Sequence, residues 1–166
     1  MIRLATKNDL DYIMNIVRQT ISIMKTEGNP QWTETYPSRD DFETDICSES
    51  LYVYTDDSTN NVIAFICINS TSTPEYSEVE WGSEQQFLVL HRLAVDSNLR
   101  KQGIGSLMLS FAEEYSKEKG IYYLRTDTNS MNKGMNGLFT KFGYVKRGEV
   151  HFRSLTEHFN CYDKLL

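Results

Sequence analysis

Residues 87–112, FLVLHRLAVDSNLRKQGIGSLMLSFA, constrain the fold more than any other part of the chain. The largely apolar run 87–95 is typical of a buried strand. A short polar connection and two glycines follow, and apolar residues then recur at helical spacing from Ile104 to Tyr115. The sequence therefore predicts a buried strand that leads through a glycine turn directly into a helix.

The turn between this strand and this helix has the features of a phosphate site. Gly103 and Gly105 carry no Cβ atom, so a ligand can approach their backbone closely. The first helical turn adds unpaired amides and the positive end of the helix dipole, and Arg100 and Lys101 add charge. A turn that merely caps or packs the helix is the alternative. A P-loop is excluded because no Gly-Lys-Ser/Thr ends the turn, and Met108 replaces the third glycine of the dinucleotide fingerprint.

Composition and charge exclude several classes of function. The 166 residues carry a net charge of −6 and show no basic stripe, which disfavours nucleic-acid binding. Because no apolar run is long enough to cross a membrane and the N-terminus lacks an apolar signal core, we expect a cytoplasmic protein without membrane contact. The cysteines and histidines show neither a disulfide framework nor metal-ligand spacing, so no metal is expected. The length favours a single domain over residues 1–166.

Hydrophobic periodicity and turn residues predict an alternation of helices and strands along the chain. In chain order, the predicted elements are a strand at 2–5, a helix capped by Thr6 and running to about residue 25, a helix at 39–47, strands at 51–54 and 62–68, a polar insert at 70–86, the strand at 87–95, a helix from 104 that closes at 119–120, a strand at 121–126, a loop at 127–131, a helix at 132–141, and antiparallel strands at 144–152 and 159–165.

The strand end and the glycine turn resemble a known cofactor signature. Arg100-x-x-Gly103-x-Gly105, after a strand that ends Leu93-Ala94-Val95, is similar to the acetyl-CoA signature of the GNAT superfamily of N-acetyltransferases. The resemblance implies an α/β (α+β) fold, in which a mixed central sheet is splayed between its two central strands, flanked by helices, and holds acetyl-CoA in the splay. The predicted order of elements matches that arrangement.

A second block, Asn132, Leu138 and Phe142-Gly143-Tyr144, resembles the family's later Asn…Leu-Tyr…Gly-Phe segment. The resemblance implies that the strand-end backbone pairs with the pantetheine arm and that the loop amides bind the pyrophosphate of coenzyme A. The implied cofactor-binding residues are Leu93, Ala94, Val95, Arg100, Lys101, Gln102, Gly103, Ile104, Gly105, Ser106, Asn129 and Asn132.

Acetyl transfer to an amine requires a proton to leave the amine and the coenzyme A thiolate to depart. An alkyl ammonium has a pKa near ~10.4, so forming the free amine at neutral pH costs roughly 4 kcal/mol, and a base is expected. His91 is the candidate, because an unperturbed imidazole is mostly neutral near pH 7 and because residues 90–95 resemble a segment of the arylalkylamine N-acetyltransferases that carries a catalytic histidine. A histidine hydrogen-bonded within the strand is the alternative. Phe139 stands where many family members carry a tyrosine as general acid, so no acid is assigned.

The acceptor contacts are expected in the loop after the first helix and in the polar insert. In the family that loop helps to form the acceptor pocket, which makes Trp32 and Tyr36 candidate substrate-binding residues; covering the core is their alternative role. Glu80, with Glu78 and Glu84, is a candidate anchor for a cationic amine, and a solvated acidic loop is the alternative.

These observations predict an acetyl-CoA-dependent N-acetyltransferase that acts on the primary amine of a small molecule or of an amino-acid-like acceptor. Two alternatives stay open: a non-catalytic acyl-CoA-binding regulatory module, which Phe139 suggests, and a protein or peptide N-acetyltransferase. The acceptor itself is not written in the sequence, because substrate loops vary freely on one scaffold. The resemblance also allows a homodimer, since family members are often dimers.

Overall fold

The computed structural model describes residues 1–152 and 155–166, through which one sheet of seven strands runs. The strand order is β1-β2-β3-β4-β5-β7-β6, and neighbouring strands are antiparallel except β4 and β5, which are parallel. The strands are β1 (Ile2–Leu4), β2 (Leu51–Thr55), β3 (Val62–Asn69), β4 (Leu88–Val95), β5 (Tyr123–Asn129), β6 (Val145–Val150) and β7 (Phe159–Leu165).

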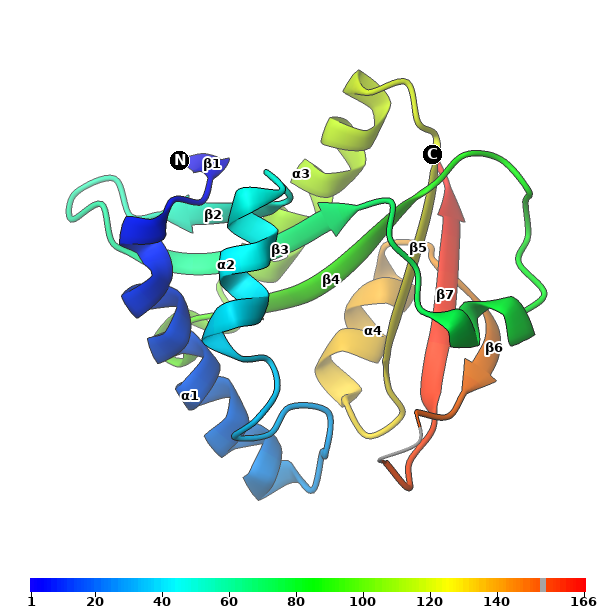
Figure 1. Cartoon of the computed structure of the whole chain (residues 1–166), viewed down its shortest axis with the longest axis horizontal. Coiled ribbons are helices and arrows are strands. Elements are labelled where there is room, and N and C mark those ends of the chain that lie inside the picture. The colour runs from blue at the N-terminus through cyan, green and yellow to red at the C-terminus, as the bar shows by residue number, and fades with distance from the viewer. Residues whose placement is uncertain (153–154) are drawn as a thin grey trace.

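The sheet is splayed between β4 and β5, as the resemblance implied. Residues 88–90 of β4 pair with residues 124–126 of β5, whereas β4 continues to Val95 against β3 alone. Figure 1 shows the two strands close together at one end and apart at the other. The sheet therefore has two halves, β1–β4 and β5–β7, joined by a short parallel contact, and the predicted splayed α/β architecture is confirmed.

Two pairs of helices cover opposite faces of the sheet (Figure 1). Alternation along β3 shows the division, because Phe65 packs with α1 and α2 whereas Ile66 packs with α3 and α4. Within the described residues, no helix has the length and apolar character needed to span a membrane. The helices are α1 (Leu10–Glu27), α2 (Arg39–Cys47), α3 (Ile104–Glu118) and α4 (Lys133–Lys141).

Local signals fix both ends of α1. Thr6 and Asp9 form the predicted capping box, but they do so around a 3-10 turn, so α1 itself begins at Leu10. Arg3 donates to both oxygens of the Asp9 carboxylate at 2.8 Å, and this ion pair ties the capping box to β1. Gly28, with φ +69°, ends the helix in the left-handed conformation and turns the chain towards the following loop.

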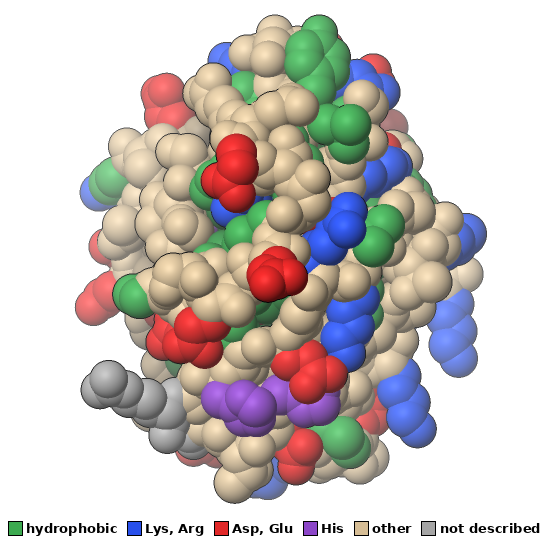
Figure 2. All heavy atoms as spheres, turned by 90° about the vertical axis from the view of Figure 1, so that its right-hand side faces the viewer, with side chains coloured by type: hydrophobic (Ala, Val, Ile, Leu, Met, Phe, Trp, Pro, Cys, Tyr) green, Lys and Arg blue, Asp and Glu red, His purple; other side chains and the backbone are tan. Residues whose placement is uncertain are grey.

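The insert between β3 and β4, residues 70–86, is more than the solvated acidic loop that its composition favours. A 3-10 turn within it buries Tyr76, and Val79 packs into the same apolar cluster. This cluster covers the β5–β7 half of the sheet and includes residues of β6 and β7. Figure 2 shows acidic side chains dispersed over this side of the molecule rather than gathered around one hollow. The exposed glutamates of the insert are Glu78, Glu80 and Glu84.

Several boundaries differ from the prediction, and one of them matters for the site. The sequence predicts a loop at 127–131, yet β5 continues to Asn129, and Asp127 pairs with Cys161 of β7. Pairing along β7 overrides the weak strand propensity of these polar residues, so the Asp127 backbone is fixed within the sheet. β6 is also shorter at both ends than the predicted strand at 144–152.

Candidate active site

The predicted phosphate turn is open and rich in amides without a helical partner. Gly103, directly before α3, has φ +84°, and Lys101 has φ +63°, so the chain turns sharply before the helix begins. The first hydrogen bond of α3 joins the Leu107 amide to the Gly103 carbonyl at 2.9 Å, and the preceding amides point out of the helix end. Residues 100–103 are exposed. The turn thus presents a positive helix end and the Arg100 and Lys101 charges to solvent.

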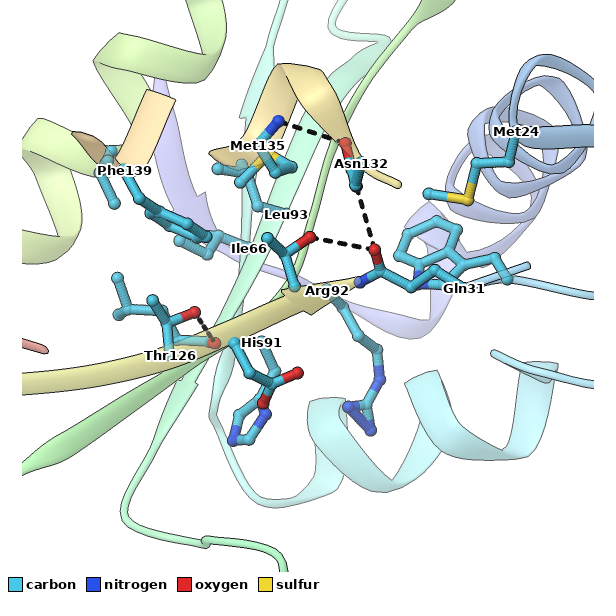
Figure 3. A pocket seen from close by; sticks show the side chains of 15 residues that line it. Met24, Gln31, Ile66, His91, Arg92, Leu93, Thr126, Asn132, Met135 and Phe139 are labelled. Atoms are coloured by element: carbon cyan, nitrogen blue, oxygen red, sulfur yellow. Dashed lines mark hydrogen bonds between the residues drawn. The ribbon is translucent and has the colours of Figure 1, made fainter. Parts of the chain in front are cut away.

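A β-bulge in β4 lies where the sheet splays. The register with β3 shifts so that Ile66 alone stands opposite Arg92 and Leu93, and Arg92 adopts φ +50°. Leu90 and Leu93 both pack towards α3 and α4. The two residues between them, His91 and Arg92, therefore both turn to the face that α1 and α2 cover, and Figure 3 shows their side chains pointing the same way.

A narrow slit lies between the two halves of the sheet (Figure 3). It holds about 40 Å³ of free space and is lined by residues of β4, β5 and α4, with Leu93, Thr126 and Met135 among them. Along residues 93–95, β4 pairs with β3 but has no strand partner on the side of β5. This free edge offers backbone donors and acceptors to an extended, amide-rich chain.

Gln31, in the loop between α1 and α2, closes one end of the slit. Its Oε1 accepts hydrogen bonds from Thr128 Oγ1 at 3.0 Å, from the Asn129 amide at 3.2 Å and from Asn132 Nδ2 at 3.0 Å. Figure 3 shows the bond between Asn132 and Gln31. Asn132 Oδ1 accepts from the Met135 amide at 3.2 Å and so caps α4. The two asparagines predicted to contact the cofactor therefore already hold this junction, and Asn129 is fully buried.

We expect Gln31→Met to destabilise the folded protein by roughly 1–3 kcal/mol, because it leaves three donors without their shared acceptor. Gln31→Glu is the matched control, since it retains an acceptor oxygen at the same chain length. Urea unfolding followed by circular dichroism measures both variants. Equal midpoints for Gln31→Met and the unaltered protein would show that the junction contributes nothing to stability.

A larger pocket of about 490 Å³ opens beside the bulge, on the face that carries α1 and α2. It shares Gln31, His91, Arg92 and Asp127 with the lining of the slit, so the two cavities meet at the bulge. Its walls come from the loop after α1, from β4 and β5, and from the segment around the start of β7. The apolar part of the wall consists of Pro30, Trp32, Tyr36, Leu90, Phe152, Leu155 and Phe159.

His91 borders this pocket, but its surroundings make it a weak base. Its Nε2 lies 3.2 Å from Asn69 Oδ1 and 3.1 Å from the Thr71 carbonyl oxygen. Both partners are acceptors, so Nε2 carries the proton and Nδ1 is the basic atom. Burial, together with the adjacent Arg92 charge, lowers the pKa of His91 to about 4. Its role as the base stays a prediction, and the low pKa counts against it.

His91→Ala should leave the acid limb of the pH–rate profile where it is, because a group with a pKa of about 4 is already neutral from about pH 5 upwards. If the variant loses rate equally at every pH, the loss would come from the missing hydrogen bonds between His91 and its partners Asn69 and Thr71. Steady-state kinetics between about pH 5 and 9 measure this. A shift of the limb in the variant would restore His91 as the base.

Asp127 is a carboxylate in the pocket that sequence reasoning missed. Tyr76 donates its hydroxyl to Asp127 Oδ2 at 2.5 Å, and no described residue bonds to Oδ1. Burial raises the pKa of Asp127 to about 6 against the effect of the Tyr76 hydrogen bond. The group is therefore mostly ionised at neutral pH and is a stronger base than His91. The signal in the sequence was a charged residue that interrupts a polar strand, Thr-Asp-Thr, and the predicted loop concealed it.

Of the three residues predicted to contact the acceptor, Trp32 and Tyr36 line the pocket and Glu80 does not. Trp32 is 6% exposed and stacks on Phe65 with ring centroids 6.4 Å apart, so it belongs to the core while its edge lines the pocket. Tyr36 is 45% exposed and borders the pocket, with its ring 6.0 Å from the Arg92 guanidinium carbon. Glu80 is exposed and is absent from the described lining of the pocket.

The position of the usual general acid faces the slit. Phe139 is 3% exposed, lines the slit and packs against Tyr144 with ring centroids 5.5 Å apart. Burial raises the pKa of Tyr144 well above its ordinary value, and Tyr144 lies outside the described lining of both cavities. Neither residue therefore gains the role of acid.

An amide-rich helix end, an unpaired strand edge and a slit that meets a pocket lined by both Arg92 and Asp127 are features that suit an acyl transferase. The chain belongs to the acetyltransferase (GNAT) family, whose model matches residues 19–144. An uncharacterized N-acetyltransferase of Bacillus subtilis (strain 168), YesJ, is 23% identical over 153 residues, which cover 87% of this chain and 81% of that protein. Family and relatives make this chain an N-acetyltransferase.

Solved structures agree with the family. A GNAT-family acetyltransferase from Streptococcus agalactiae 2603 superimposes with a TM-score of 0.88 at 26% identity, covering 100% of this chain and 95% of that chain. A GNAT-family acetyltransferase from Listeria monocytogenes 4b F2365 gives a TM-score of 0.77 at 20% identity, covering 100% and 94%. The second likeness supports the fold alone.

Proposed function

We propose that this N-acetyltransferase moves the acetyl group of acetyl-CoA to the primary amine of a small molecule. The observation that carries the proposal is the junction of two cavities at the β4 bulge. The slit runs beside the free edge of β4, where Leu93 lines it, and the pocket holds Asp127 next to an apolar wall. A thioester in the slit and an amine in the pocket would meet at Leu90, His91 and Arg92, which line both.

The residues of the splay fit a coenzyme A thioester. The amides before Leu107 suit a pyrophosphate, because they lack helical partners and lie at the positive end of α3. The free edge of residues 93–95 suits the pantetheine amides, and it also supplies an amide near the reacting carbonyl. A Cβ at Gly105 would meet Leu138 at 3.5 Å, an ordinary contact, so packing within the fold does not itself require glycine at this position. The slit must widen from about 40 Å³ to admit the arm.

Acetyl-CoA, once bound, supplies the activated acetyl group, and Asp127 does the acid–base work on the acceptor. Its carboxylate binds the incoming ammonium and accepts one proton from it, which frees the nitrogen lone pair for attack on the thioester carbonyl. The second proton would then pass from nitrogen to coenzyme A, which leaves as the thiolate. A base with a pKa of about 6 matches neutral pH better than His91, whose pKa is about 4. The Tyr76 hydroxyl holds Asp127 Oδ2, which leaves Oδ1 for the acceptor.

The size of the pocket favours a small acceptor over a protein. Walls from the loop after α1 and from the segment before β7 stand on either side of β4 and β5. A peptide substrate requires an open groove along which the chain can leave, and about 490 Å³ suits a compact molecule. A protein or peptide N-acetyltransferase is the second candidate, and peptide acceptors test it.

The deciding experiment for the cofactor is a calorimetric titration of the full chain with acetyl-CoA and with free coenzyme A. We expect micromolar binding, about −8 kcal/mol, because a pyrophosphate and a pantetheine arm are both held. Absence of binding would reduce the glycine turn to a helix cap and would overturn the proposed function.

Coenzyme A release with a panel of amines and peptides then separates the alternatives. Turnover with small amines supports the proposal. Acetylated peptides identified by mass spectrometry, without turnover of small amines, would overturn the preference for a small acceptor. Tight binding of acetyl-CoA without turnover on any acceptor would indicate a regulatory module.

A further inference from the structure

We propose that the acceptor is an amine that also carries a carboxylate, with an apolar body between or beside the two groups, and that Arg92 binds the carboxylate. An apolar α-amino acid has this chemistry. The inference rests on the proposed function and deepens it, because it assigns the second charged group of the same pocket. The bulge in β4, the orientation of Arg92 and the composition of the pocket wall carry it.

The bulge places Arg92 where regular strand alternation would not. Without the extra residue, Arg92 would point to α3 and α4 as Leu90 does; with it, Arg92 and His91 share the face of the pocket. Arg92 adopts φ +50° to do so, a conformation that is unfavourable for a residue with a long side chain. Strained backbone of this kind persists where the direction of a side chain matters.

Asp45, which does not line the pocket, pairs with the guanidinium of Arg92 and leaves some of its N–H donors free for a ligand. Asp45 of α2 pairs with it at 3.4 Å (Nε to Oδ2) and 3.5 Å (Nη2 to Oδ1), distances that are long for a bidentate pair. No described residue bonds to Nη1, and neither Nε nor Asp45 Oδ2 makes a well-directed hydrogen bond. Asp45 itself lies outside the described lining of the pocket, whereas Arg92 borders it. Asp45 thus steadies the cation without covering its outer atoms.

Arg92 and Asp127 line the same pocket. Tyr36 borders the same pocket, and its ring centroid lies 6.0 Å from the Arg92 guanidinium carbon. The pocket therefore carries one cation and one anion, complementary to the carboxylate and ammonium of a zwitterion. The remaining wall, with Phe152 and Phe159 among its members, is apolar and suits a hydrophobic side chain.

The test compares matched acceptors in which the carboxylate alone changes. We would measure kcat/KM for L-phenylalanine, L-leucine and L-methionine against their carboxamides, with acetyl-CoA saturating. The unaltered protein should prefer the acids by about tenfold to a hundredfold, the contribution of a charge-assisted hydrogen bond pair. Calorimetric binding of N-acetyl-L-phenylalanine and of its amide repeats the comparison without turnover.

Variants tie the preference to Arg92. Arg92→Met leaves Asp45 buried without a partner and risks unfolding, so the double variant Arg92→Met/Asp45→Asn removes both charges together. We expect the acid-to-amide ratio of the double variant to fall to about one or below, and Arg92→Lys to retain part of the preference, because the charge remains without the planar fork.

Three outcomes would overturn the inference: equal or better rates with the amides in the unaltered protein, an unchanged ratio in the double variant, or turnover confined to amines without a carboxylate. In each of these the proposed N-acetyltransferase activity would stand. Failure of every amine in the panel, acids and amides and simple alkylamines alike, would instead count against the proposed function.

Discussion

Replacing Asp127 with asparagine is expected to lower kcat/KM for acetyl transfer by about 10²- to 10⁴-fold, the usual contribution of a positioned general base. Asparagine keeps the shape of the side chain and an oxygen that accepts from the Tyr76 hydroxyl. It loses the charge that binds the ammonium and the lone pair that takes its proton. In the unaltered protein, kcat/KM should rise through about pH 6, the pKa of Asp127, and the variant should lose this limb.

The same substitution should stabilise the folded protein at neutral pH. The pKa of Asp127 is raised from 3.8 to about 6, so folding favours the protonated form. Its contribution to stability is fully present below pH 3.8 and is lost as the pH rises through about 6. Above that pH the buried charge costs about 3 kcal/mol relative to the neutral form. Asp127→Asn should therefore be more stable than the unaltered protein at pH 7 to 8, with the difference vanishing near pH 4.

Asp163→Asn is the matched control. Asp163 on β7 also accepts a tyrosine hydroxyl, that of Tyr123, but it is ion-paired with Arg147 at 2.8 Å and accepts from the Gly82 amide at 2.8 Å. Its neutralisation should destabilise the fold at neutral pH, the opposite sign to Asp127→Asn. Thermal unfolding of both variants from about pH 4 to 8, beside kinetics at the same pH values, makes the comparison. A stable but fully active Asp127→Asn enzyme would remove Asp127 from the chemistry.

Gly103→Trp is expected to weaken acetyl-CoA binding by at least about 100-fold, because a large side chain at the mouth of the turn blocks the amides that would hold the pyrophosphate. The position itself tolerates volume, since a Cβ built at Gly103 meets no atom within 4 Å. The loss should therefore come from exclusion of the ligand and from the φ of +84°, rather than from a clash within the fold.

Gly120→Trp separates these two causes. Gly120 follows the other end of α3, has φ +72° and also has no atom within 4 Å of a built Cβ. It carries the same backbone strain without facing the phosphate turn. Calorimetric titration with acetyl-CoA should give near-normal affinity for Gly120→Trp and a large loss for Gly103→Trp. Equal affinities for the two variants would show that the turn takes no part in binding the cofactor.

The turn proposed to hold the cofactor was predictable as a structure because it is built from local sequence. Gly103 and the residues around it form a strand, a turn and a helix start that lie within one short stretch, and the proposed contacts come from backbone amides rather than from long-range side-chain contacts. The splay and the mixed sheet followed from the resemblance and are confirmed. The hydrophobic periods of α1 and α3 likewise predicted both helices, because each buries a face at helical spacing.

The acceptor half was not predictable, because it depends on contacts between distant segments. Gln31 bonds to Thr128, Asn129 and Asn132 across about a hundred residues of chain, and no local pattern announces such a contact. The surroundings of His91 were not predictable either, since burial and Arg92 lower its pKa to about 4 from the unperturbed value.

The sequence by itself determined the class of this protein: a glycine turn after a buried strand, in a chain whose elements follow the GNAT order, indicated the family that the family model confirms. Only the tertiary structure decided which side chains line the pocket proposed for the acceptor. A single extra residue in β4 turns Arg92 to the face that holds Asp127, and pairing with β7 draws Asp127 out of a predicted loop into the sheet. The bulge and the extension of β5 depend on pairing with strands that lie far away in the sequence, so no local sequence pattern predicts them.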